Sequence, residues 1–429
     1  MTLMAVGGVA CVPTVQDCVP TTLATGGFGL SFTLSFLLFA AGGVALGTLS
    51  GLIPGLHANN FALLLAATAP SIPAPPLLVG VAMLTAGVVH TFLDIVPALA
   101  LGVPDAAMAI AALPGHRLVL AGRGREALRL SAVGSALAVV IAVPLAIPIT
   151  WFMLQSYPTI RANLWIVLGG VVLFLVLTES SPAAAVGGLF SFLLAAVLGW
   201  FTLDVSFEAP LGSGSMLTPL LTGLFGAPIL IDAMGGDGVP PQADARLTMK
   251  RTDLALTASA GSVAGAIVGY LPGISSAIAS VMALPAVPNR DVDRGFVVTT
   301  SGANTANTVF ALFALIALGT PRTGVMVAID RTQVPLELAV LLPAVLVGAA
   351  CGFVLVILVG DAYLRTVGNM AYTRMSIVLL VFLAGLSFAL TGAFGVLVFV
   401  VAAVIGLVPT RFGARRVHLM GVLIGPLML

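Results

Sequence analysis

Two Pro-Gly pairs are each followed by small polar residues. Proline and glycine interrupt helices, and Asn and Ser are favoured where the next helix starts. The free N–H groups of a helix start carry partial positive charge and attract anions. We therefore predict an anion site at both bends, although the same residues would also serve as plain helix caps. The candidates are Pro54, Gly55, His57, Asn59 and Asn60 in the first segment and Pro272, Gly273, Ser275 and Ser276 in the second.

A second polar group occurs later in the chain. Asn304 and Asn307 belong to the run TTSGANTANT, residues 299–308, which we place directly ahead of an apolar helix. Amides and hydroxyls at this density can hydrogen-bond an oxyanion or coordinate Na⁺. Arg322 follows a proline and can hold a carboxylate bidentately, or it can lie at the membrane surface. We add Asn304, Asn307 and Arg322 to the candidate substrate site.

Three titratable residues form the candidate ion-coupling group: His90, Asp94 and Asp105. Asp94 lies in an otherwise apolar stretch four residues after His90, so the two side chains share one helix face. A carboxylate inside a membrane is costly and marks an ion or substrate path by default. A single acid beside a histidine suits coupling to H⁺ or Na⁺. The alternative is that Asp94 only orients His90 through a buried hydrogen bond and that Asp105 lies at the surface.

Enzymatic motifs are missing from the sequence. It contains no H-E-x-x-H, no P-loop and no G-x-S-x-G, and its 4 histidines are scattered. We expect no catalytic residue, no bound metal and no cofactor apart from H⁺ or Na⁺ as the coupling ion. The net charge of +1, without a basic stripe, also excludes a nucleic-acid-binding protein.

The composition is that of a membrane protein. Of 429 residues, 59% are hydrophobic and 8% are charged, whereas soluble domains are about 25% charged. Several uncharged runs are long enough for a helix that crosses a bilayer, which takes about 20 residues: 254–289, 295–321, 338–360 and 376–410. The 48 glycines and 27 prolines are tolerated in membrane helices that pack against protein or line a cavity. The sequence thus predicts an all-α polytopic fold with broken helices.

The chain contains an internal repeat. GTLSGLIPGL (residues 47–56) reappears as GAIVGYLPGI (265–274), with the same G-xxx-G-xx-P-G spacing. HTFLDIVPALALGVPD (90–105) aligns without gaps to NTVFALFALIALGTPR (307–322). The repeat glycines are most simply explained by close helix packing. Two matching blocks in the same order indicate a gene duplication.

Charge and span counting give the expected topology. Basic residues gather in loops that we place in the cytoplasm, so the N-terminal stretch 1–28 is extracytoplasmic and 233–253 is a cytoplasmic linker. The transmembrane repeats are then 29–232 and 254–429, in inverted orientation. The apolar stretch after each bend is too short to span, which predicts re-entrant Pro-Gly hairpins that meet near the centre, as in many secondary transporters. A parallel duplication is the alternative.

The sequence resembles the large permease subunit of tripartite tricarboxylate transporters. The resemblance rests on the two Pro-Gly motifs, the loop GHRLVLAGRGREAL (115–128), LTPLLTGLF (217–225), Asn304 with Asn307, and the motifs LGVP (101–104) and LGTP (318–321). The chain departs from the family pattern at His57 and at Ser275 and Ser276. The resemblance implies ion-driven uptake of citrate-like carboxylates with a small membrane subunit and an extracytoplasmic solute-binding protein. It also implies that Pro54, Gly55, Pro272, Gly273, Asn304 and Asn307 line the pathway.

We therefore expect a multi-pass protein of the cell membrane that imports small di- or tricarboxylates by secondary active transport. The main alternative is a carrier of polyprenyl-phosphate or another anionic lipid, which would use the same helix starts but need a lateral opening to the bilayer. A scaffold that transports nothing is the third possibility.

Overall fold

The computed structural model describes residues 29–53, 61–62, 65–66, 68–101, 112–205, 209–210, 215–234, 240–243, 246–283, 285, 287, 292–367 and 372–428. The regular elements of this part are all helical. The first half contains α1 (Leu30–Leu52), η2 (Ala69–Ser71), α3 (Pro76–Leu93), α4 (Ile95–Leu101), α5 (Ala112–Leu120), α6 (Gly124–Ala162), α7 (Leu164–Leu177), α8 (Pro182–Thr202), α9 (Leu217–Leu221), η3 (Thr222–Gly226) and α10 (Ala227–Ala233). The second half contains α11 (Arg251–Tyr270), α12 (Ser276–Ala283), α13 (Val292–Leu318), α14 (Gly324–Arg331), α15 (Leu338–Val367), α16 (Tyr372–Gly406), α17 (Val408–Arg411), η6 (Arg416–Met420) and α18 (Gly421–Met428).

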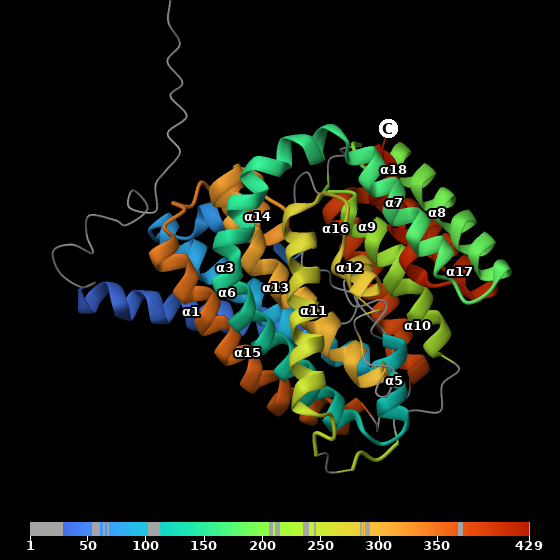
Figure 1. Ribbon diagram of the computed structural model, residues 1–429, viewed down its shortest axis with the longest axis horizontal. Helices are drawn as coiled ribbons and strands as arrows, with labels where there is room; N and C mark the ends of the chain where they lie inside the picture. Colours follow the sequence, from blue (N-terminus) through green and yellow to red (C-terminus); the bar gives the residue numbers. More distant parts are fainter. Residues whose placement is uncertain are drawn as a thin grey trace, which may run out of the picture.

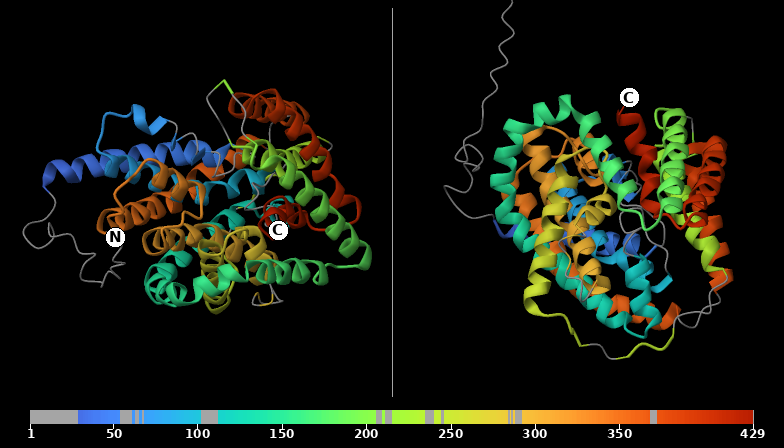
Figure 2. Two further views of the ribbon diagram at one scale, coloured as in Figure 1. Left: turned by 90° about the horizontal axis from the view of Figure 1, so that it is seen from above. Right: turned by 45° about the vertical axis from the view of Figure 1, so that its right-hand side comes forward.

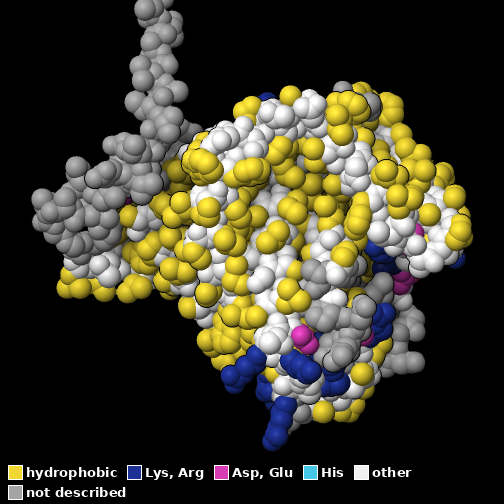
Figure 3. Space-filling view, in the orientation of Figure 1, with side chains coloured by type: hydrophobic (Ala, Val, Ile, Leu, Met, Phe, Trp, Pro, Cys, Tyr) yellow, Lys and Arg dark blue, Asp and Glu magenta, His cyan; other side chains and the backbone are white. Residues whose placement is uncertain are grey.

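The helices confirm the prediction of an all-α membrane protein. Among the described residues, 8 helices are long and apolar enough to cross a bilayer. The surface is largely apolar over most of the face seen in Figure 3. Trp151, Trp165 and Trp200 are all exposed, as is typical of aromatic residues that anchor a protein at the membrane boundary.

The helices form two bundles (Figure 1). The first bundle consists of α1, α3–α6, α11 and α13–α15, and the second of α7–α10 and α16–α18 with η3 and η6. Figure 2 shows the second bundle together on one side of the molecule from two directions. Each bundle takes its helices from both halves of the chain, because residues 29–162 pack with 251–367 and residues 164–233 pack with 372–428.

The repeat glycines let paired helices touch. A Cβ at Gly47 of α1 would collide with the backbone of Ala86 on α3, and one at Gly265 of α11 would collide with Ala306 and the backbone of Asn307 on α13. The same holds for Gly51 against Leu93 and Gly269 against Phe310. In both pairs, later glycines contact later residues of the partner, so α1 runs parallel to α3 and α11 parallel to α13. The packing interpretation of these glycines is therefore correct.

The third long helix of each half packs on the other half. Gly134 of α6 lies against Val298 of α13, and Ser135 donates to the carbonyl of Ser301 at 3.1 Å. In the same manner, Gly348 and Gly352 of α15 lie against Val88 and Phe92 of α3. The order of these contacts makes α6 parallel to α13 and α15 parallel to α3.

The second bundle repeats this exchange. Gly421 of α18 packs on the backbone of Phe192 in α8, and Gly223 of η3 packs on the backbone of Phe399 in α16. α16 is itself bent at Gly392, whose φ of 68° is accessible to glycine at little cost. Glu179, in the turn between α7 and α8, accepts from His418 at 2.8 Å and from Arg415 at 2.9 Å. This cluster joins the first half to η6 in the second.

Several ion pairs gather at one end of the first bundle, which we call the charged end. Glu126 at the start of α6 pairs with Arg294 at the start of α13 at 3.0 Å. Arg117 pairs with Asp293, and Asp361 near the end of α15 pairs with Arg125. Lys and Arg side chains are grouped at the lower end of the molecule in Figure 3. Helices α6 and α13 therefore start at the charged end, and α15 finishes there.

The polar run of residues 299–308 lies within α13 rather than ahead of it, so our placement of this run was wrong. Several of its small side chains find hydrogen-bond partners on neighbouring helices, which lowers the cost of burying them. Thr299 donates to the carbonyl of Thr257 on α11 at 3.1 Å, and Thr305 donates to Ser135 on α6 at 2.9 Å.

Candidate functional site

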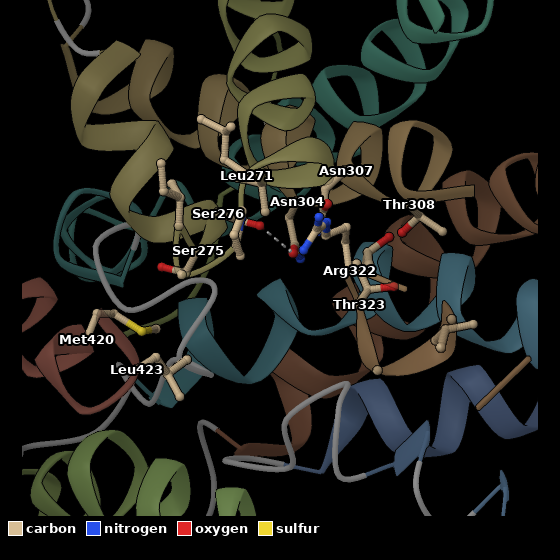
Figure 4. A pocket seen from close by; sticks show the side chains of 18 of the residues that line it. Leu271, Ser275, Ser276, Asn304, Asn307, Thr308, Arg322, Thr323, Met420 and Leu423 are labelled. Atoms are coloured by element: carbon tan, nitrogen blue, oxygen red, sulfur yellow. Dashed lines mark hydrogen bonds between the residues drawn. The ribbon is translucent and has the colours of Figure 1, made fainter. Parts of the chain in front are cut away.

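A cavity of about 160 Å³ lies at the second Pro-Gly bend, between the two bundles. Its polar wall comes from the bend, from α13 and from the start of α14, with Thr91 of α3, while Leu221, Met420 and Leu423 of the second bundle close the apolar side. Figure 4 shows Ser276, Asn304, Asn307 and Arg322 around one space. The polar lining residues are Thr91, Ser275, Ser276, Asn304, Asn307, Thr308, Arg322 and Thr323.

The bend ends one helix and starts another at the cavity. α11 stops at Tyr270, Pro272 lacks the N–H that would continue it, and Gly273 turns the chain with a φ of 80°. Ser275 then caps α12, because its hydroxyl accepts from the backbone N–H of Ile278 at 3.4 Å. The start of α12 therefore borders the cavity, because Ser275 and Ser276 both line it, and a helix start favours negative charge.

A second helix start borders the same cavity. Thr323 caps α14 by accepting from the backbone N–H of Met326 at 3.4 Å. Arg322, one residue earlier, donates to the hydroxyl of Tyr157 on α6 and lies 5.2 Å from the centre of its ring. Within the described part of the chain, no carboxylate lies within ion-pair distance of Arg322. The cavity thus has a cation whose charge is not neutralised by these residues.

Asn304 connects the cavity to a buried carboxylate. Its side-chain nitrogen donates to Oδ2 of Asp94 at 2.6 Å, and its oxygen accepts from the hydroxyl of Ser276 at 3.4 Å. Asn304 and Ser276 line the cavity, whereas Asp94 lies behind Asn304 and is not part of the wall. Asn304 lies about 18 Å along α13 from the charged end, at about 1.5 Å per residue, which is near the middle of a bilayer core of about 30 Å.

His90 and Asp94 both lie deep in the protein, with 0% and 3% of their surface exposed. Asp94 occupies the end of α3, where its backbone N–H donates to the carbonyl of His90 at 2.9 Å. Nδ1 of His90 lies 2.9 Å from the hydroxyl of Ser50 on α1, and the ring stacks on Phe61. The structure therefore places His90 against α1 and Asp94 against α13.

The predicted site residues divide into two groups. The structure brings Pro272, Gly273, Ser275, Ser276, Asn304, Asn307 and Arg322 together around one cavity and places Asp94 one hydrogen bond away. The remaining candidates except His90 lie outside the described residues, so the meeting of the two bends stays a prediction: Pro54, Gly55, His57, Asn59, Asn60 and Asp105.

Sequence reasoning missed four contributors to the site, one of which is Thr323, the residue directly after the candidate Arg322. Thr91 and Thr308 both line the cavity and are equivalent positions of the repeat, so the alignment itself could have identified them. Tyr157, which holds Arg322, belongs to α6 and has no counterpart in the matched blocks. No local pattern marks it.

This arrangement suits an anion. Two helix starts, one arginine and two amides offer hydrogen-bond donors in a space enclosed by apolar helices, where such donors act more strongly than in water. The described residues contain no group of three or more His, Cys, Asp or Glu side chains able to hold a metal.

A multi-helix membrane protein with a broken helix at a buried polar cavity is typical of the class of membrane transporters. The chain belongs to the tripartite tricarboxylate transporter TctA family, whose sequence profile matches residues 37–421. This result confirms the resemblance found in the sequence. The chain is also similar to the uncharacterized protein MJ1079 of Methanocaldococcus jannaschii, with 26% identity over 402 residues that cover 92% of this chain and 98% of that protein. No solved structure gives a significant match.

Proposed function

We propose that this permease imports small di- or tricarboxylates by secondary active transport and that the cavity at the second Pro-Gly bend binds them. The observation that carries the proposal is Arg322, whose guanidinium lines a cavity bordered by the starts of α12 and α14. Arginine recognises carboxylates through two parallel hydrogen bonds. Asn304 and Asn307 add amide groups that can hold a second carboxylate of the same molecule.

We infer further that the two halves are inverted repeats. The equivalent helices α3 and α13 support this inference, because α13 starts at the charged end whereas α3 runs parallel to α15, which finishes there. α11 and α13 are parallel, so the chain returns to the charged end between them through the bend and α12. This path supports the proposal of a re-entrant hairpin. Because cytoplasmic loops carry an excess of basic residues, we place the charged end on the cytoplasmic side of the cell membrane or inner membrane.

Asp94 is our candidate for ion coupling, together with His90. A carboxylate at this depth binds H⁺ or Na⁺, and its bond to Asn304 brings that event within one residue of the cavity. As in other tripartite systems, we expect a small membrane subunit and an extracytoplasmic solute-binding protein as partners.

Reconstitution tests the function directly. Purified protein in proteoliposomes, with and without Na⁺ and pH gradients, should accumulate radiolabelled citrate or succinate when a gradient is imposed and exchange it when none is. Ionophores that collapse the gradient should stop accumulation. If no carboxylate moves while a short-chain polyprenyl phosphate does, the chain is a lipid carrier and the proposal is wrong.

A further inference from the structure

Asn304 occupies a position that no repeat symmetry explains. The equivalent residue of α3 is Gly87, which also lines the cavity, and the position equivalent to Asp94 is Ala311 on α13. Asn304 and Asp94 therefore occur as a pair that is absent at the two repeat-equivalent positions. The Asn304 side-chain nitrogen on α13 lies 2.6 Å from Oδ2 of Asp94 at the end of α3.

The two ends of this amide have opposite hydrogen-bonding roles. The nitrogen can only donate, and it donates to Asp94; the oxygen can only accept, and it accepts from Ser276. Ionised Asp94 is an acceptor and fits this arrangement. A neutral carboxyl carries an O–H that must find an acceptor because the group is 3% exposed.

We propose that the Asn304 side chain is a proton-controlled relay that sets how many hydrogen-bond donors the cavity offers to an anion. When Asp94 takes up one proton from water, its O–H donates to the Asn304 oxygen after a half-turn of the amide. The amide nitrogen then faces Ser276 and the cavity. The Ser276 hydroxyl is released at the same time, so protonation supplies two donors to an anion without moving any helix.

The relay makes proton and anion binding cooperative. With Asp94 ionised, the amide nitrogen is directed at the carboxylate, where one of its two N–H groups is bonded, and the carboxylate repels an anion nearby. When Asp94 is neutral, the repulsion is absent and the two donors are available. The proton and the anion therefore stabilise the same state of the protein. This cooperativity rests on the proposed function, whereas the response of Asn304 to Asp94 does not.

Among the described residues, the surroundings leave Asp94 as the acid that can drive this relay. α1 has no titratable side chain, and the titratable or charged side chains of α13 are Asp293 and Arg294 in its first turn, at the charged end. Asp361 on α15 is occupied in ion pairs at the charged end. The helices packed against α3 and α13 carry further titratable or charged groups besides Arg322, which precedes α14. These are His90 on α3, His116 and Arg117 on α5, Arg125, Glu126, Arg129, Tyr157 and Arg161 on α6, Arg251, Asp253 and Tyr270 on α11, Asp330 and Arg331 on α14, and Cys351, Tyr363 and Arg365 on α15.

The test that requires no substrate is infrared difference spectroscopy of the protein as pH is lowered, with carbon-13 in the side-chain amide of asparagine. In the wild type, a carboxylic-acid band and a shifted amide band should appear with the same pH midpoint. Asp94→Asn should remove both bands, and Asn304→Ala should remove the amide shift and keep the acid band. An amide band that stays fixed while the acid band appears, or no acid band that depends on Asp94, would overturn the relay.

Binding provides the second measurement. Calorimetry with fumarate, whose carboxyl groups stay ionised through the neutral range, should show affinity rising by roughly 10- to 100-fold as pH falls through the infrared midpoint, the size expected for hydrogen bonds to a charged group. Asn304→Ala should bind weakly at every pH. Asn307→Ala, which removes a neighbouring amide, should also bind less but keep the pH dependence. If Asn304→Ala keeps the full pH dependence of fumarate affinity, the relay is wrong. If fumarate binds neither the wild type nor any variant, the proposed function fails, and the infrared result alone decides whether the relay exists.

Discussion

Asp94 is the residue on which the proposed ion coupling depends. It is buried, lies near the middle of the bilayer and is hydrogen-bonded to the cavity residue Asn304. A carboxylate in this position can exchange its negative charge for a neutral form as an ion binds. Asparagine has nearly the same shape but cannot ionise, so it separates the hydrogen bond from the charge.

We predict that Asp94→Asn abolishes gradient-driven uptake of citrate or succinate and keeps some exchange. The reason is that asparagine at position 94 mimics the neutral carboxyl permanently, so the variant cannot release an ion on the opposite side of the membrane. Uptake and counterflow in proteoliposomes measure the two activities separately. Asp330→Asn, at an exposed position of α14, is the control and should transport normally; concentrative uptake by Asp94→Asn at the wild-type rate would refute the coupling role.

Arg322 should determine affinity for the anion. We expect Arg322→Gln to weaken citrate binding by roughly 10- to 100-fold, from the loss of charged hydrogen bonds, and Arg322→Lys to lie between, because an ammonium group lacks the bidentate fork. Tyr157→Phe, which removes only the hydroxyl that accepts from Arg322, should have a smaller effect. Calorimetry measures all three.

The exposed Arg331 provides the matched control for this series. Arg331→Gln removes the same charge from the other end of α14 and should bind citrate like the wild type. Equal affinities of Arg322→Gln and the wild type would mean that the anion is held elsewhere.

The residues of this site could be predicted in part from sequence, for definite reasons. Pro272, Ser276 and Asn304 stand out because polar or helix-breaking residues in an apolar chain have few explanations. The meeting of Asp94 with Asn304 could not be predicted, because it depends on how α3 crosses α13 and links positions 210 residues apart. Tyr157 was missed because an aromatic residue near a helix end is usual in membrane proteins.

At the level of elements, glycines rather than side-chain bonds bring the helices together. α1 shows the distinction within one helix, because a Cβ at Gly47 would strike the backbone of Ala86 whereas one at Gly42 has nothing within 4 Å. The helices can approach closely only where the side chain is absent.

We predict that Gly47→Ala and its repeat equivalent Gly265→Ala each lower stability by about 1–3 kcal/mol, the usual cost of overpacking. Gly42→Ala should be neutral or slightly stabilising, since alanine is the better helix former. Thermal unfolding in detergent, followed by circular dichroism, compares the three. Equal melting temperatures for Gly42→Ala and Gly47→Ala would contradict the contact between α1 and α3.

The whole molecule is held together across its two halves. Glu179 of the first half is 2% exposed at the side chain and is bonded to Arg415 and His418 of the second. Burial alone would raise the pKa of Glu179, but the hydrogen bonds from His418 and Arg415 and the charge of Arg415 outweigh it and lower the pKa to about 2. The ionised carboxylate therefore stabilises the folded state.

The sign of the pH effect follows from this lowered pKa. The stabilisation is fully present above the ordinary value of 4.5 and is lost as pH falls from 4.5 to about 2. We expect Glu179→Gln to lose stability on the order of 3 kcal/mol at neutral pH, and its melting temperature in detergent to approach that of the wild type in this acid range. Asp204→Asn, at an exposed position, should follow the wild-type profile throughout. A constant difference between Glu179→Gln and the wild type would exclude this ionisation as the cause.

The membrane fold itself was accessible from sequence, because long uncharged runs have one structural solution in lipid. The exchange of helices between the halves was not. Ser135 of α6 and Val88 of α3 look like ordinary membrane residues, and only the three-dimensional packing reveals that their neighbours come from the other half. A repeat in sequence specifies that two units exist, not which of their helices pair.

This exchange has a consequence for how the protein is made. The chain is synthesised from its N-terminus, so α6 enters the membrane before α11 and α13 exist. At that stage Ser135 and Glu126 lack Thr305 and Arg294, which are translated about 170 residues later. The nascent first half is consequently an incomplete structure in which Ser135 lacks its partners on α13, and the permease can reach its final packing only when most of the second half has been synthesised.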